Sequence, residues 1–246
     1  MLELGLYEEL RQLPAGRPLM RHTWLDLTFL HFAVEPEVVQ RTLPPGMTVD
    51  TYPDSAGKEM AWVGFVPFRM EGVKFERVLQ IAGSHAFPET NVRTYVHWDG
   101  KVPGVWFYSL DASNPLAVFG ARASFGLPYK WARMTCARDD QEVTYNSRRY
   151  RTGAGVRGSS TFGEELGRAE PGSLEYFLIE RYVLYSWHWR RIVTAQVHHL
   201  PYPLRRVQWQ GEESLTAAAG FNPLPWQHQI FSDGLQVEVF PLRPCP

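Results

Sequence analysis

The sequence predicts a β-rich α+β fold, formed by a single domain over residues 1–246. Short stretches in which apolar and polar residues alternate recur along the whole chain, and turn residues separate them. Few stretches have apolar residues at helical spacing. Most connections are short, which favours antiparallel neighbours in one sheet. Hydrophobic residues make up 44% of the chain and aromatic residues 14%, which excludes a disordered protein.

The predicted helices are short, and two of them have clear start signals. Asn114 and Pro115 precede one helix, and Ser173 caps another that we expect to continue to Tyr182. A short alanine-rich segment follows over residues 212–219. The four expected helices cover residues 6–13, 36–43, 116–123 and 174–182.

About ten strands account for most of the remaining chain. We expect a turn at Glu71-Gly72, an irregular segment over residues 83–88, and a hairpin turn at Asp99-Gly100. The expected strands cover residues 24–34, 49–52, 61–70, 91–98, 104–110, 127–135, 142–151, 156–162, 191–200 and 235–240.

The charge balance provides no overall electrostatic attraction to nucleic acid or to anionic membranes. The net charge is −1, and no apolar stretch approaches the roughly 20 residues of a membrane span. The cluster Arg148–Arg151 is the one feature that favours a nucleic-acid binder, and that interpretation requires binding to a duplex at low salt. The N-terminal stretch is acidic, unlike a signal peptide, and Cys136 and Cys245 form no metal-binding pattern. We therefore expect a cytoplasmic protein with two free thiols.

Familiar cofactor and metal motifs are missing from the sequence. It has no Walker loop, no dinucleotide-binding glycine pattern, no hydrolase nucleophile elbow and no zinc-protease helix motif. His198 and His199 are adjacent in a predicted strand, so only one of them can face a given site. We therefore predict no cofactor and no metal site.

A polar strand face offers the first candidate site. Asn91, Arg93 and Tyr95 alternate with apolar residues, and Glu89 precedes them on the same face. Directional donors of this kind suit a carboxylate or a carbonyl group, so the row can line a ligand site. Alternatively, Arg93 pairs with Glu89 or with Asp111 inside a barrel and has a purely structural role.

Lys130 is the second candidate. The chain has 21 arginines and only four lysines, and the other three lysines lie at predicted turns. Lys130 lies between Tyr129 and Trp131, where burial could lower the pKa of the amine enough for imine formation. In the alternative, the lysine points outward and interrupts an apolar face. Glu180 and Arg181 could add an acid and a charge partner, or belong to a solvated helix face.

At these residues the sequence resembles the uncharacterised DUF2071 (YqjF-like) family over roughly residues 20–240. The blocks that carry the resemblance are residues 88–96, 104–112, 121–134, 180–185 and 198–204. This family is grouped with the acetoacetate decarboxylase-like fold. The resemblance therefore implies a cone-shaped antiparallel β-barrel with a ligand cavity inside, flanked by extra sheet and short helices.

The resemblance also bears on the reaction. The decarboxylases carry Arg-Glu-x-x-Gly-x-Pro-Lys-Lys, in which the first lysine forms a Schiff base and the second lowers its pKa. The corresponding stretch here is Arg-Ala-Ser-Phe-Gly-Leu-Pro-Tyr-Lys over residues 122–130. Arg122 matches, but Tyr129 occupies the Schiff-base position and Lys130 the position of the second lysine. Glu89 resembles the glutamate of the decarboxylase cavity.

These observations lead to one preferred hypothesis: a cavity protein that acts on or binds a small organic acid or carbonyl compound, with lyase-like chemistry if it is an enzyme. Arg93 and Lys130 would hold the anion, while Glu89 and Tyr129 would transfer protons. Asn91, Tyr95 and Arg122 complete the expected site. The alternative is a non-catalytic ligand-binding or oligomer-forming protein in which these residues are structural. By analogy with the fold we expect a homo-oligomer, and we expect a dimer before any larger assembly.

Overall fold

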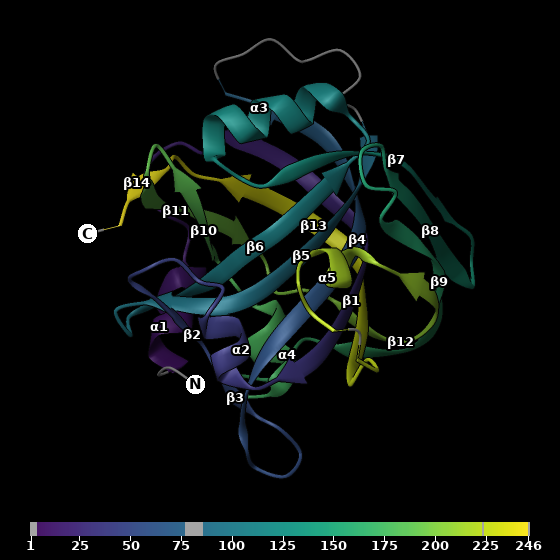
Figure 1. Cartoon of the computed structure of the whole chain (residues 1–246), viewed down its shortest axis with the longest axis horizontal. Coiled ribbons are helices and arrows are strands. Elements are labelled where there is room, and N and C mark those ends of the chain that lie inside the picture. Colours follow the sequence, from purple (N-terminus) through teal and green to yellow (C-terminus); the bar gives the residue numbers. More distant parts are fainter. Residues whose placement is uncertain (1–3, 77–85, 223, 246) are drawn as a thin grey trace.

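The structure is a computed structural model that describes residues 4–76, 86–222 and 224–245. Figure 1 shows a strongly curved sheet with α3 across one end and α4 near the opposite end. The helices are α1 (Leu4–Arg11), α2 (Pro36–Gln40), α3 (Pro115–Phe125), α4 (Leu174–Ile179) and α5 (Leu215–Ala218). The strands are β1 (Met20–Val34), β2 (Met47–Val49), β3 (Tyr52–Pro53), β4 (Glu59–Phe75), β5 (Ala86–Trp98), β6 (Val102–Ala112), β7 (Tyr129–Arg138), β8 (Glu142–Arg149), β9 (Gly155–Gly167), β10 (Val183–His188), β11 (Arg191–His199), β12 (Leu204–Glu213), β13 (His228–Val239) and β14 (Arg243–Pro244). The expected β-rich α+β chain is confirmed.

The sheet closes on itself into a barrel. Strands β6, β10, β11, β13, β1, β4 and β5 pair in this order, and β5 pairs again with β6. Most pairs are antiparallel, as the short connections predict, while β6 runs parallel to both β7 and β10. A second closed circuit passes from β6 through β7, β8, β9 and β12 to β13, and shares β1, β4 and β5 with the first. The shared strands therefore separate two interiors.

Alternation along the shared strands fills both interiors. On β4, Val66 and Phe68 belong to the cluster inside the first circuit, whereas Val63 and Phe65 belong to the cluster inside the second. Because successive side chains of a strand point to opposite faces, such a strand is buried on both sides and reads as a nearly continuous apolar run. This explains the apolar run over residues 61–68.

Several elements differ from the predictions. The expected turn at Glu71-Gly72 lies within β4, because Gly72 has a φ of 63° and the pairing with β1 shifts its register there. The hairpin at Asp99-Gly100 and the caps at Asn114 and Ser173 are confirmed. Residues 83–85 of the expected irregular segment lie outside the described residues, and residues 86–88 belong to β5.

The helix that Ser173 caps ends at Ile179, three residues before the expected Tyr182. The apolar residues that follow it form β10, a strand that the sequence did not reveal, and β12 was missed as well. Glu180 accepts hydrogen bonds from the Tyr182 hydroxyl and from the Tyr202 N–H, the latter at 3.1 Å. The helix face expected for Glu180 and Arg181 is therefore absent from this segment.

Other expectations concern cysteines, histidines and membrane spans. Both cysteines are free thiols, as predicted. His199 is buried and His198 half-buried, consistent with opposite faces of β11. Across the described parts of the chain, no group of three or more histidine, cysteine or acidic residues is arranged to hold a metal ion. Within the same parts, no helix is both long enough and apolar enough to cross a membrane.

Candidate functional site

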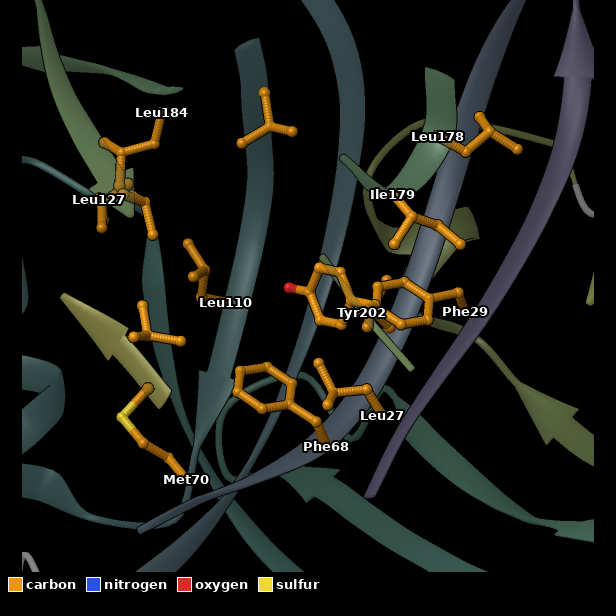
Figure 2. Close-up of a cluster of buried hydrophobic side chains, with 14 of the residues drawn as sticks. Leu27, Phe29, Phe68, Met70, Leu110, Leu127, Leu178, Ile179, Leu184 and Tyr202 are labelled. Atoms are coloured by element: carbon orange, nitrogen blue, oxygen red, sulfur yellow. The ribbon is translucent and has the colours of Figure 1, made fainter. Parts of the chain in front are cut away.

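The first barrel circuit encloses a cavity of about 400 Å³. All seven strands of the circuit contribute to its lining, and α3 lies over one end. Most of the lining is apolar. Figure 2 shows part of this wall, where Phe68, Leu110 and Leu127 come from different segments and surround one space. Pockets of this size that are mostly apolar with a few polar groups are typical of small-molecule sites.

Helix α3 is held in place at both ends. The Asn114 side chain accepts hydrogen bonds from the N–H groups of Leu116 and Ala117, at 2.9 and 3.2 Å. The helix ends at Gly126, whose φ of 65° favours glycine and whose added Cβ would lie 2.4 Å from the Trp187 carbonyl oxygen. This termination sets the start of β7, which begins with Tyr129.

Three residues of the predicted polar row line the cavity: Glu89, Asn91 and Arg93. They alternate on β5, so their side chains share the face that looks into the first circuit. Tyr95 continues the row but is fully buried beyond the cavity lining. Three of the four residues of the predicted row therefore face the cavity, while Tyr95 does not belong to its lining.

Glu89 and Tyr129 form a buried acid pair. The Tyr129 hydroxyl donates to Glu89 Oε2 at 2.9 Å, and both side chains are buried. Burial raises the pKa of Glu89 to about 8, because the charged form loses its hydration; the Tyr129 hydrogen bond opposes this rise and the charge of Asp111 adds to it. Burial raises the pKa of Tyr129 well above 10, and the charge of Glu89 and the hydrogen bond to it add to this rise. At neutral pH the pair is therefore uncharged and holds a proton that can be transferred.

Arg93 is a buried cation that lacks a carboxylate partner among the residues that the structure describes. The two other arginines that are buried in the described ranges are both paired: Arg149 with Asp111 at 2.7 Å and Arg181 with Asp50 at 2.8 Å. The structural pair of Arg93 with Glu89 or Asp111 does not form. A buried charge without a counterion is costly, so this position favours a bound anion.

Further polar atoms around the cavity have no hydrogen-bond partner within the described ranges. These include Asn91 Oδ1 and Arg181 Nη2. Three others belong to two residues that the sequence did not single out: both ring nitrogens of His22, and Nε1 of Trp24. Burial lowers the pKa of His22 to about 3, so its ring is neutral. His22 and Trp24 are two residues apart, the spacing of side chains on one strand face. The predicted strand began only at Trp24, so this pattern was missed.

A chain of polar contacts supports Arg93 from behind. Arg93 Nε donates to the Tyr95 hydroxyl at 3.4 Å, and that hydroxyl lies 2.7 Å from His31 Nε2. His31 Nδ1 is 3.0 Å from His228 Nδ1, and His228 Nε2 faces the Glu175 carboxylate at 3.7 Å. The Tyr95 oxygen accepts from Arg93, while the donor in each histidine contact depends on the ring tautomer. The polar contacts therefore connect the Arg93 cation to the neighbourhood of the Glu175 anion.

Lys130 lies outside the cavity. It follows Tyr129 on β7 and therefore points to the opposite face, where it is exposed. Partial burial, Arg122 and Arg149 lower the pKa of this amine, yet it does not line the cavity. Arg122 also lies outside the lining and donates from Nε to the Tyr129 carbonyl oxygen at 2.7 Å. The expected anion contact of Lys130 and ligand contact of Arg122 therefore find no support in this geometry.

Comparisons with known proteins agree with the fold. Residues 21–236 match the family DUF2071, described as an uncharacterized conserved protein. The uncharacterized protein YqjF of Bacillus subtilis strain 168 is 35% identical over 196 residues, which are 79% of this chain and 78% of YqjF.

Solved structures resemble the chain at low sequence identity. The acetoacetate decarboxylase of Legionella pneumophila has a TM-score of 0.61 and 12% identity, over 98% of this chain and 95% of that one. The enduracididine biosynthesis enzyme MppR, complexed with pyruvate, has a TM-score of 0.59 and 14% identity, over 94% and 91%. These likenesses establish an acetoacetate decarboxylase-like fold. The match over residues 21–236 and the identity with YqjF establish the family as well. The chain belongs to the DUF2071 family.

Proposed function

We propose that the protein binds a small organic acid or carbonyl compound in the barrel cavity, with an anionic group at Arg93, and that Glu89 and Tyr129 exchange a proton with it. The observation that carries this proposal is the buried guanidinium of Arg93, which lines the cavity and has no carboxylate partner among the described residues. The pyruvate complex of MppR, a protein of the same fold, supports the choice of ligand class.

The geometry favours proton transfer over imine chemistry. All four lysines of the chain are exposed, and none belongs to the residues that line the cavity. The position that resembles the Schiff-base lysine holds Tyr129, whose hydroxyl cannot form an imine. Glu89, in contrast, can give its proton to a carbonyl oxygen. In its ionised form it can take a proton from the carbon beside that carbonyl, and the same carboxyl returns it.

Deuterium exchange tests this function without knowledge of the full reaction. Oxo acids with the carbonyl at increasing distance from the carboxylate, from pyruvate through levulinate to longer chains, are incubated with the protein in D₂O. Loss of the proton signal beside the carbonyl is followed by NMR. At least one acid should exchange faster than in buffer, and the Glu89→Gln variant should abolish the acceleration while Lys130→Ala leaves it unchanged.

The pH dependence of exchange identifies the base. With the pKa of Glu89 at about 8, the ionised fraction rises roughly tenfold per pH unit below that value, and the rate should follow it. Acids that bind in an Arg93-dependent manner but never exchange would support the non-catalytic binding protein. Binding that survives Arg93→Met unchanged would refute the anion site itself.

The cellular location and the oligomeric state remain predictions. We expect a cytoplasmic protein that forms a homo-oligomer, and a dimer of the 28.3 kDa chain is the first assembly to test. Light scattering coupled to size exclusion would give the mass in solution.

A further inference from the structure

The polar and apolar parts of the cavity occupy different ends. Arg93 and Arg181 meet at the Tyr95 ring, with their guanidinium carbons 5.7 and 5.0 Å from its centroid. Only Asp50 compensates these two cations among the described residues, because it pairs with Arg181 while Arg93 has no such partner. This end of the cavity therefore carries an excess positive charge that suits one carboxylate.

Toward α3 most of the cavity lining is apolar. Phe68 lies opposite Glu89 in the pairing of β4 with β5, and Met70 lies opposite Phe87. All four of these residues line the cavity, and Ala121 of α3 lines it as well. Figure 2 shows the Phe68 and Met70 side chains on the same side of this space. Besides the uncharged Glu89–Tyr129 pair, this part holds His22 and Trp24, and Trp24 lies opposite Met70 in the pairing of β1 with β4. Its other contacts with a ligand are mostly hydrocarbon.

Resting on the proposed function, we propose that the natural ligand is a medium-chain carboxylic acid, with its carboxylate at Arg93 and its apolar chain directed past Glu89 toward α3. A three- or four-carbon acid at Arg93 would leave the mostly apolar part to water, which finds few polar partners there beyond His22, Trp24 and the Glu89–Tyr129 pair. A hydrocarbon chain fills it and gains the free energy of leaving water.

The strand spacing sets the length of the chain. Four residues separate Arg93 from Glu89 on β5, or about 13 Å at about 3.3 Å per residue, and Phe87 lies about 7 Å beyond. The arginine side chain spans part of the first distance. An extended chain advances about 1.2 Å per bond, so a ligand of roughly six to ten carbons reaches from the guanidinium past Glu89. Any group that Glu89 protonates then lies several carbons from the carboxylate.

A chain-length series tests the inference. Straight-chain acids from butanoate to dodecanoate are titrated into the protein at pH 7 by calorimetry, with octanol as the uncharged counterpart of octanoate. Each added methylene should lower Kd about fourfold up to about eight carbons, the value for a buried methylene. The gain should end near ten carbons, and octanol should bind far more weakly than octanoate.

Two variants separate this inference from the function it rests on. Ala121→Phe narrows the α3 end, so it should weaken octanoate binding at least tenfold and leave butanoate unchanged. Arg93→Met should weaken acids of every length. Affinities that depend on Arg93 but not on length would overturn the medium-chain ligand and leave the acid-binding function intact. If no acid binds, or if binding ignores Arg93, both fall; thermal unfolding of each variant checks that it is folded.

Discussion

Replacing Glu89 with glutamine should change how stability depends on pH. The buried carboxyl stays protonated in the folded protein up to a pKa of about 8, whereas in the unfolded chain it ionises near 4.5. Between these values the unfolded state binds fewer protons, so the wild type loses about 1.4 kcal/mol of stability per pH unit. Its stability contribution is complete below pH 4.5 and is lost by about pH 8. The glutamine side chain does not titrate, so the variant lacks this pH dependence of stability.

The free energy of unfolding in urea, measured from pH 5 to pH 8, gives the difference between the variant and the wild type. That difference should shift in favour of Glu89→Gln by about 3.5 kcal/mol over this range. Other titrating groups act equally in both proteins and cancel. An exposed control, Glu212→Gln, should show a constant difference. A constant difference for Glu89→Gln as well would mean that the carboxyl is ionised in the fold, and the acid pair would have to be abandoned.

Three further perturbations address neighbouring parts of the site. Borohydride reduction in the presence of pyruvate or levulinate should add no mass to the wild type, and an adduct that Lys130→Ala removes would instead establish imine chemistry. Arg149→Met leaves the Asp111 carboxylate buried without its partner, so the free energy of unfolding should fall by about 3–5 kcal/mol, and a loss below 1 kcal/mol would contradict a buried ion pair. Tyr95→Phe removes the hydroxyl between Arg93 and His31 and should cost about 1–3 kcal/mol in urea unfolding, with an unchanged midpoint as the contrary result.

The candidate site was predictable where it depends on the local chain. Alternation with a period of two placed Glu89, Asn91 and Arg93 on one strand face, and the fold leaves that face looking into the cavity. The Asn114 cap likewise depends on neighbours in sequence. Such features follow from the backbone geometry of one element, so tertiary packing does not need to be known.

The charge partners were not predictable in the same way. Asp111 pairs with Arg149, which lies 38 residues further along the chain, and Arg181 pairs with Asp50 from 131 residues away. Both pairs depend on which strands become neighbours. The strongest sign of a ligand is that Arg93 has no carboxylate partner in the part of the chain that the structure describes, and this is visible only after every nearby carboxylate there has been assigned. The missed β10 has a similar cause, because its residues are buried and read like a continuation of the preceding helix.

The register of β7 decides whether Tyr129 or Lys130 faces the cavity. Tyr129 and Lys130 are adjacent, so one strand can present only one of them to the ligand. The sequence left this choice open, because both orientations satisfy the alternation of a short strand. The pairing of Leu110 with Tyr129 and the hydrogen bond from Tyr129 to Glu89 fix the phenol inward. The cavity lining then includes the Glu89–Tyr129 acid pair and none of the four lysines. Inserting or deleting one residue before Tyr129 would exchange the two side chains.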